Sequence, residues 1–307
     1  MKILMRHLAN LPSFSDSGND TDSGDVVKRI LDSNPLLEAF GNAKTSRNDN
    51  SSRFGKYIQL QIKNSTTSPL KVDCVLDGSV CESYLLEKSR VVGHEKGERT
   101  YHIFYQLLGA PESYKTSLWK GLSNTNVESF KYVGSTDTHM IEGVADGDKW
   151  HNTIESLAQV GVEGETLHHL MRGICIVLQL GNLTFEIDPT NDDGCIISSD
   201  KELDSLADLM GVSKDFLLTS LTIRTVTART DVYKVPQNAV AAKDGCDALA
   251  KEIYNKIFDW LVVTINSATE SKCSNTRIGL LDIFGFESFE TNRKYKLFVT
   301  YLLFSAF

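Results

Sequence analysis

A short polar stretch directly before a predicted strand constrains the fold of this chain more than any other feature. The residues that follow it, 57–62, alternate apolar with polar side chains, which is typical of a strand with one buried face. Polar loops at strand ends are where α/β folds place ligand contacts. We therefore expect an α/β fold with a candidate ligand site in this stretch, which reads Asn48-Asp49-Asn50-Ser51-Ser52-Arg53-Phe54-Gly55-Lys56.

The side chains of this stretch suit a polyphosphate that binds together with a metal ion. The adjacent hydroxyls of Ser51 and Ser52 can ligate Mg²⁺ and bind a phosphate oxygen. The amides of Asn48 and Asn50 can donate to phosphate or orient a water, and Arg53 offers a planar fork of donors. A plain polar turn before a strand explains the same residues without any ligand.

A second stretch favours the ligand interpretation. The apolar run 278–281 leads into Asp282-Ile283-Phe284-Gly285-Phe286-Glu287. Asp282 can hold a magnesium-bound water, and Gly285 can bring its backbone N–H close to a terminal phosphate. Glu287 can form an ion pair with Arg53. A buried strand followed by an ordinary turn is the alternative.

Together the two stretches resemble the switch I and switch II loops of the myosin motor head, and the resemblance extends over about residues 2–292. It implies an α/β fold in which a partial P-loop NTPase-type twisted central sheet supports a large, mostly helical upper subdomain that binds actin. Other segments that match the family are Asn34–Thr45, Tyr84–Val91, Gly97–Leu108 and Asp247–Lys251.

The resemblance implies an actin-activated ATPase that hydrolyses Mg-ATP to move along actin filaments. Magnesium would be ligated by Ser52 directly and by Asp282 through a water. The catalytic group would comprise Asn48, Ser51, Arg53, Gly285 and Glu287, of which Arg53 and Glu287 pair when switch II closes. The nucleotide with its metal would be contacted by Asn48, Asn50, Ser51, Ser52, Arg53, Asp282 and Gly285.

The resemblance also points to one residue on the side that faces actin. Family members carry an acidic or phosphorylatable residue 16 positions before the Asp-Ala-Leu-Ala-Lys motif, and counting back from Asp247 reaches Asp231. A permanent charge would make phosphorylation at this position unnecessary. A solvated polar loop residue is the alternative.

The resemblance divides the chain into segments. We expect residues 1–292 to be an incomplete motor domain and 293–307 to be a tail unrelated to the family, which we attribute to a misread exon boundary. The phosphate-binding loop (G-x-x-x-x-G-K-S/T), the relay helix and the converter are not found in the sequence, so we expect the chain alone to be inactive. The expected parts are the end of the phosphate-loop helix (1–12), a flexible surface loop (13–25), switch I (44–56), sheet strands (57–97), the helical upper subdomain (98–266), and the switch II strand and loop (276–287).

Composition narrows the functional classes. The 307 residues carry a net charge of −8, which argues against general binding to nucleic acid or anionic membranes. The six cysteines are scattered without a C-x-x-C pair, as expected for reduced thiols in the cytoplasm. The apolar run 173–185 is too short to span a bilayer, which needs about 20 residues. We expect a cytoplasmic protein of the actin cytoskeleton that meets light chains or calmodulin only through a neck outside this sequence.

Periodicity predicts the remaining elements. A turn cluster at 63–69 precedes a partner strand at 70–76, and residues 223–235 are extended. Helices are expected at 36–40, 98–108, 150–158, 165–180, 201–210, 215–221 and 240–265. The last of these is expected to direct inward Ala248, Leu249, Ile253, Ile257 and Leu261.

Two other interpretations stay open. The chain can be a non-catalytic truncated head that serves as an actin- or partner-binding module. It can also be an unrelated phosphate-binding α/β enzyme, but such an enzyme needs a phosphate loop of its own, and the sequence contains none.

Overall fold

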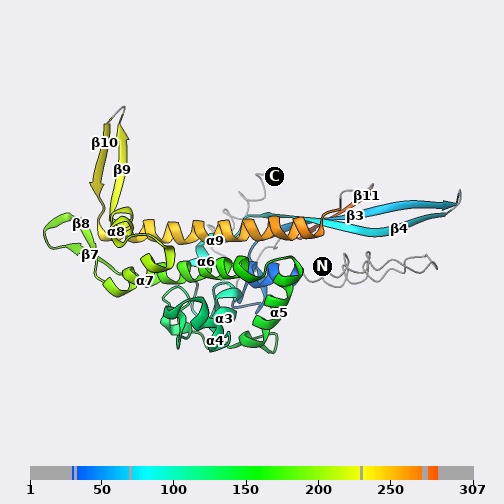
Figure 1. The fold of residues 1–307 in the computed structure, drawn as a ribbon, viewed down its shortest axis with the longest axis horizontal. Helices are drawn as coiled ribbons and strands as arrows, with labels where there is room; N and C mark the ends of the chain where they lie inside the picture. Colours follow the sequence, from blue (N-terminus) through cyan, green and yellow to red (C-terminus); the bar gives the residue numbers. More distant parts are fainter. Residues whose placement is uncertain (1–29, 31–32, 69–70, 229–230, 272–275, 283–307) are drawn as a thin grey trace.

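A long helix, α9 (Ala239–Thr269), is the axis along which the other elements are arranged (Figure 1). The computed structural model describes residues 30, 33–68, 71–228, 231–271 and 276–282. Helix α6 (Gly164–Asn182) runs beside α9. A hairpin lies at one end of α9 and a three-stranded sheet at the other (Figure 1).

The sheet has the order β11-β3-β4 and is antiparallel throughout. Its strands are β3 (Gly55–Ser68), β4 (Lys71–Tyr84) and β11 (Thr276–Asp282). The predicted hairpin is present, but the predicted turn cluster at 63–69 is wrong, because β3 continues to Ser68 and β4 continues to Tyr84. Polar Ser and Thr residues continue a strand where cross-strand hydrogen bonds to a neighbour are available, and β4 supplies them.

Most of the helices that periodicity predicts are present. Residues 33–41 are helical, and the helices predicted at 150–158, 165–180, 201–210, 215–221 and 240–265 all form. The helical elements beside α6 and α9 are η1 (Lys88–Val91), α3 (His102–Leu108), α4 (Glu112–Leu118), η2 (Lys120–Leu122), η3 (Val127–Ser129), α5 (Asp146–Gln159), α7 (Asp200–Met210) and α8 (Lys214–Thr222).

Short antiparallel pairs connect these helices. The extended region predicted at 223–235 is confirmed as the hairpin β9 (Ile223–Ala228) and β10 (Asp231–Pro236). The other pairs are β1 (Asn42–Ala43) with β2 (Ser51–Ser52), β5 (Met140–Ile141) with β6 (Val144–Ala145), and β7 (Phe185–Asp188) with β8 (Asn191–Ile197).

The helix predicted at 98–108 begins only at His102. The residues before it are engaged elsewhere: the backbone N–H of Arg99 donates to the carbonyl of Lys44, and Tyr101 forms an isolated bridge with Ala43. Every residue of α3 is buried, so no single apolar face distinguishes it. The segment expected to hold sheet strands, 57–97, contains strand only to Tyr84, after which η1 follows.

Aromatic side chains in the core join α9 to elements that lie before β3 and after β4 in the sequence. The ring of Tyr254 stacks on Tyr101 at 4.9 Å and on Phe104 at 5.2 Å between ring centroids. Its hydroxyl donates to the carbonyl oxygen of Phe40 at 2.7 Å. The rings of Phe54 and Phe258 meet edge to face at 5.0 Å. Because Phe54 directly follows the candidate loop, this packing fixes the start of β3 against α9.

The predicted inward face of α9 is wrong for Ala248 and Leu249, while Ile253, Ile257 and Leu261 contact the core. Ala248 and Leu249 are exposed, Ile253 and Ile257 are half-buried, and only Leu261 of the predicted set is buried. The buried stripe is rotated because the large aromatic rings on the neighbouring face fill the space beside α3 and the sheet. That stripe consists of Ala242, Cys246, Ala250, Tyr254, Phe258, Leu261, Val262, Ile265 and Thr269.

Candidate functional site

The loop between β1 and β2 holds most of the predicted site residues. The two strands pair Asn42 with Ser52 and Ala43 with Ser51, which closes residues 44–50 into a compact loop. Within it, the N–H of Thr45 donates to the carbonyl of Asn48 at 2.9 Å. The loop therefore has a defined conformation set by its own backbone, and we call it the 44–50 loop.

The two asparagines of the site have different roles in this loop. The side chain of Asn48 is exposed and accepts a hydrogen bond from the N–H of Asn50 at 2.9 Å. The side chain of Asn50 points into the protein: its Oδ1 accepts from Asn42 Nδ2 at 3.0 Å, and its Nδ2 donates to Glu38 at 3.3 Å. Asn48 is thus available to a ligand, whereas Asn50 holds the loop.

The hydroxyls of the site are adjacent and partly engaged. Ser51 is buried, and its Oγ accepts from an Nη of Arg53 at 3.2 Å. The half-buried hydroxyl of Ser52 donates to the carbonyl of Phe54 at 2.8 Å. A hydroxyl that donates its hydrogen to a carbonyl keeps its lone pairs, so Ser52 remains capable of ligating a cation.

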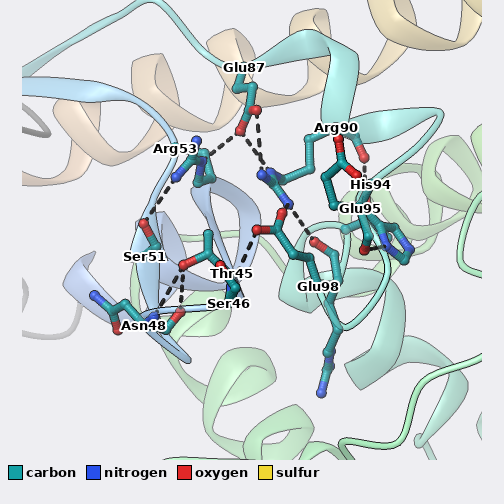
Figure 2. A network of polar contacts seen from close by, with 12 residues as sticks. Thr45, Ser46, Asn48, Ser51, Arg53, Glu87, Arg90, His94, Glu95 and Glu98 are labelled. Atoms are coloured by element: carbon teal, nitrogen blue, oxygen red, sulfur yellow. Dashed lines mark hydrogen bonds and ion pairs between the residues drawn. The ribbon is translucent and has the colours of Figure 1, made fainter. Parts of the chain in front are cut away.

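Arg53 forms an ion pair with Glu87, which follows β4 (Figure 2). Arg53 Nε lies 2.6 Å from Glu87 Oε2, and Arg90 Nε lies 2.7 Å from the same oxygen. Arg90 also donates to Glu98 at 2.9 Å, and Glu98 accepts from the backbone N–H of Ser46 at 3.3 Å. This network, which we call the Glu87 network, connects Ser46 in the 44–50 loop to Arg53, the residue after β2.

The electrostatics of the network favour a charged Glu87. Burial alone would raise the pKa of this carboxyl, but hydrogen bonds from Arg90 and Arg53 outweigh burial and lower the pKa below its usual value. For Arg90, burial acts to lower the pKa, and the bonds to Glu87 and Glu98 raise it instead. Both partners therefore stay ionised at neutral pH.

Sequence reasoning did not assign Glu87 a role. The residue falls within the matching segment 84–91, and the structure pairs it with Arg90, three positions on. Its contact with Arg53 joins residues 34 positions apart, which no local pattern reveals. The predicted partner of Arg53, Glu287, lies outside the described residues, as does Gly285.

Asp282 lies at the end of the sheet that carries the loop. It is the last residue of β11 and pairs in register with Lys56, near the start of β3. Lys56 Nζ is 3.7 Å from Asp282 Oδ2, and the Asp282 side chain is 44% exposed. Strand β3 begins at Gly55, directly after Arg53 and Phe54. The Asp282 carboxylate and the residues that lead out of the loop therefore lie at the same end of the sheet.

Asp231 lies far from this group. It is the exposed first residue of β10, in the hairpin at the opposite end of α9 from the sheet (Figure 1). Its carboxylate therefore cannot contact a ligand held by the loop.

The donor set indicates how a metal could be held. Among the described residues, no group of three or more His, Cys, Asp or Glu side chains is placed to bind a metal. A serine hydroxyl with one nearby carboxylate fits magnesium that takes its remaining ligands from phosphate oxygens and water. Within the described part of the chain, no helix has the length and apolar content to cross a bilayer.

Comparison with known proteins gives consistent matches. The family model for the myosin head (motor domain) matches residues 1–302. Myosin ID heavy chain of Dictyostelium discoideum is 37% identical over 98% of this chain and 26% of its own length. Myosin-52 of Schizosaccharomyces pombe is 35% identical over 95% of this chain and 19% of its own length. For Myosin-1 of Arabidopsis thaliana the identity is 38%, over 95% of this chain and 23% of its own length.

These matches bear on length and boundaries. The chain spans roughly a quarter of the length of the curated relatives that it matches. The matched range includes residues 293–302, which were assigned above to an unrelated tail and lie outside the described residues, so the boundary at Asn292 stays a prediction.

Proposed function

Because the chain belongs to the myosin motor-head family, whose members are actin-activated ATPases, we propose that it carries the two nucleotide-sensing loops of an actin-based motor. One observation carries this proposal. The polar stretch leads into β3 at the end of the sheet where β11 finishes at Asp282. Hydroxyl, amide, guanidinium and carboxylate groups therefore gather there, from Asn48, Ser51, Ser52, Arg53 and Asp282. Such a set suits a polyphosphate with its magnesium ion.

The residues have separate tasks in this proposal. When bound, Mg-ATP supplies the phosphoanhydride bond to be broken and the metal that neutralises its charge. Ser52 would ligate the metal, and Asp282 would hold one of its waters. Asn48, Ser51 and the backbone of Gly285 would orient the terminal phosphate and the attacking water. Pairing of Arg53 with Glu287 would close the site and exclude bulk water, and positioning of this kind is the main source of rate in phosphoryl transfer.

We propose the finer architecture on the same basis. The three described strands would be one side of a P-loop NTPase-type twisted sheet, with the helices from α3 to α9 as the upper subdomain. The exposure of Ile278 and Leu281 on β11, 40% and 62%, supports a sheet that extends beyond the described strands. Residues 1–12, 13–25, 44–56 and 276–287 would be the phosphate-loop helix end, the surface loop, switch I and switch II, with 293–307 as a tail.

Actin filaments are the proposed partner of the hairpin β9–β10. Its side chains are largely exposed, including Val226, Val232 and Tyr233, and Asp231 adds a permanent negative charge. We accordingly propose that the protein acts at the actin cytoskeleton.

We expect the 307-residue chain to bind nucleotide weakly on its own. Its sequence contains no G-x-x-x-x-G-K-S/T loop, which would supply roughly five charge-assisted contacts to phosphate. Each such contact contributes about 1.5–3 kcal/mol. Losing them removes on the order of 8 kcal/mol or more, which turns a micromolar site into one weaker than millimolar.

The test is a titration of the isotope-labelled chain with Mg-ATP to about 10 mM, followed through backbone amide signals. We expect shifts at residues 48–53 and 276–282, without saturation. Ser52→Ala should abolish the part of the shift that requires magnesium. Ser117→Ala is the matched control, because its exposed hydroxyl bonds only to its own helix, at Tyr114.

Each outcome has a distinct meaning. Saturation at micromolar Mg-ATP would contradict the expected weakness while supporting the site. Shifts outside the two stretches, or shifts in Ser52→Ala equal to those of the parent chain, would overturn the site. Binding to actin filaments without any nucleotide response would favour a non-catalytic binding module.

A further inference from the structure

A buried histidine contacts the 44–50 loop from the helical side. His102 is the first residue of α3 and is 3% exposed. Its Nε2 lies 3.1 Å from Oδ1 of Asn50. The preceding residue, Tyr101, bridges Ala43 at the other end of the loop. The start of α3 therefore contacts both ends of the loop.

The hydrogen-bond partners of Asn50 determine which nitrogen of His102 carries the proton. Asn50 Nδ2 faces the carboxylate of Glu38 at 3.3 Å and must be the donor there. Its Oδ1 consequently faces Asn42 Nδ2 and His102 Nε2, and it accepts from both. His102 Nε2 thus bears the hydrogen, and Nδ1 carries the bare lone pair.

The rest of the imidazole favours a neutral ring. Among the described residues, the buried Nδ1 of His102 has no hydrogen-bond partner, so an added proton there would be an unpaired buried donor. Burial, together with the positive charges of Arg99 and Lys149, lowers the pKa of His102 to about 3. The ring is therefore a neutral, single-tautomer donor throughout the physiological pH range.

We propose that His102 is a positioning residue of the candidate site, whose Nε2–H holds the Asn50 amide and thereby the backbone that presents Ser51 and Ser52. Asn50 has its side chain turned inward, so it acts on a ligand through the loop conformation. His102 supplies a donor from a rigid, fully buried helix, which the loop residues themselves do not provide. The importance of this contact for nucleotide binding rests on the proposed function.

The test compares two substitutions of similar volume. Glutamine places its Nε2 amide near the position of the imidazole Nε2 and retains a donor, whereas leucine retains bulk without one. Amide hydrogen exchange of the whole chain is then measured peptide by peptide. We expect His102→Leu to accelerate exchange at residues 44–53 by about 10-fold, with α6 unchanged, and His102→Gln to stay within about 3-fold of the parent chain. His151→Leu, on the exposed side of α5, is the control.

A second variant approaches the same bond from the loop. Asn50→Leu should reproduce the loop-confined acceleration, and combining it with His102→Leu should add little, because both remove one interaction. This pair keeps the test decisive if His102→Leu alone does not fold.

The outcomes separate this inference from the proposed function. Equal acceleration by glutamine and leucine, or acceleration that includes α6, would overturn the positioning role and leave only a packing role. Loop-confined acceleration in a chain that shows no Mg-ATP shifts would support the positioning role while refuting the nucleotide site. If both hold, His102→Leu should also weaken the Mg-ATP shifts at residues 48–53 several-fold, and His102→Gln should restore them.

Discussion

At the scale of single residues, the candidate site depends on one carboxylate shared by two guanidinium groups. Glu87 accepts from both Arg53 and Arg90, and the Arg90 side chain is only 7% exposed. A nearly buried cation that loses its partner is costly, because its desolvation is then uncompensated. The network should therefore matter for folding as well as for the orientation of Arg53.

The substitution Glu87→Gln tests how far the Glu87 carboxylate stabilises the folded chain by compensating the two guanidinium charges. We expect the free energy of unfolding at pH 7 to fall by about 2–3 kcal/mol, since the neutral amide leaves the charges of Arg53 and Arg90 less compensated. Urea unfolding measures it. Glu142→Gln is the control, because Glu142 is 55% exposed and pairs with Lys149 only at 3.7 Å. It should change stability by less than about 0.5 kcal/mol, and equal effects of the two substitutions would contradict the network.

The lowered pKa of His102 predicts how stability depends on pH. The unfolded chain protonates this ring near its usual pKa of 6.5, while the folded chain does so only near 3. The stability contributed by neutral His102 is thus present above pH 6.5 and is lost as pH falls. The slope approaches about 1.4 kcal/mol per pH unit.

The relevant window lies between pH 6.5 and 4.5, because the lowered pKa of Glu87 begins to affect stability only below its usual value of 4.5. Chemical unfolding at several pH values in this window measures the slope. His102→Gln should flatten it by about one proton equivalent. A slope unchanged by the substitution would mean that His102 is protonated in the folded protein.

At the scale of elements, α9 is stabilised by its aromatic stripe. Tyr254 is completely buried, and its hydroxyl bonds to the carbonyl of Phe40. We expect Tyr254→Phe to lower the free energy of unfolding by about 1–2 kcal/mol, because the buried carbonyl loses its donor. Leu249→Ala, on the face that periodicity wrongly directed inward, should cost less than about 1 kcal/mol. Thermal unfolding of both variants checks the order, and a larger loss from Leu249→Ala would restore the predicted face.

Two glycines provide a matched pair within the helices. A Cβ on Gly245 in α9 would meet no atom within 4 Å, whereas a Cβ on Gly41 would lie 2.3 Å from the ring of Phe54. Gly245→Ala should therefore raise the free energy of unfolding by about 0.5–1 kcal/mol through helix propensity. Gly41→Ala should lower it by about 1–3 kcal/mol through overpacking. Denaturant titration distinguishes the two, and a stable Gly41→Ala would show that Phe54 can move aside.

These elements also show which features the sequence could predict. Helical periodicity located α5 to α9, because each has enough turns for the pattern to repeat. The phase of α9 was missed, since hydrophobicity alone does not reveal that Tyr254 and Phe258 rather than Leu249 fill the space beside α3. The loop residues of the candidate site were predicted from their chemistry and from the family resemblance, and their role stays a prediction. Glu87 and His102 were not assigned to it, because their contacts with Arg53 and Asn50 depend on the tertiary fold.

At the scale of the whole molecule, the sheet divides into a three-stranded and a two-stranded part. Strand β11 pairs with β3 only from Lys56 to Ile62, and beyond Ile62 the described strands β3 and β4 have only each other. Two-stranded ribbons are marginally stable in water. We expect amides at 63–66 to exchange at least about 10-fold faster than those at 57–60, as measured by hydrogen exchange. Equal protection would indicate that a further partner covers the distal ribbon.

Helix α9 connects the two ends of the molecule mechanically. At its C-terminal end, the Asn266 side chain bonds to both the N–H and the carbonyl of Cys81 at 2.8 Å, and Thr269 bonds to Ser79. At 1.5 Å per residue its 31 residues form a rod of about 46 Å. If the sheet twisted and tilted this rod by about 5°, its far end would swing by roughly 4 Å. A small tilt at the end of the sheet beside Asp282 would thus become a displacement as large as a side chain at the hairpin β9–β10, which carries Asp231.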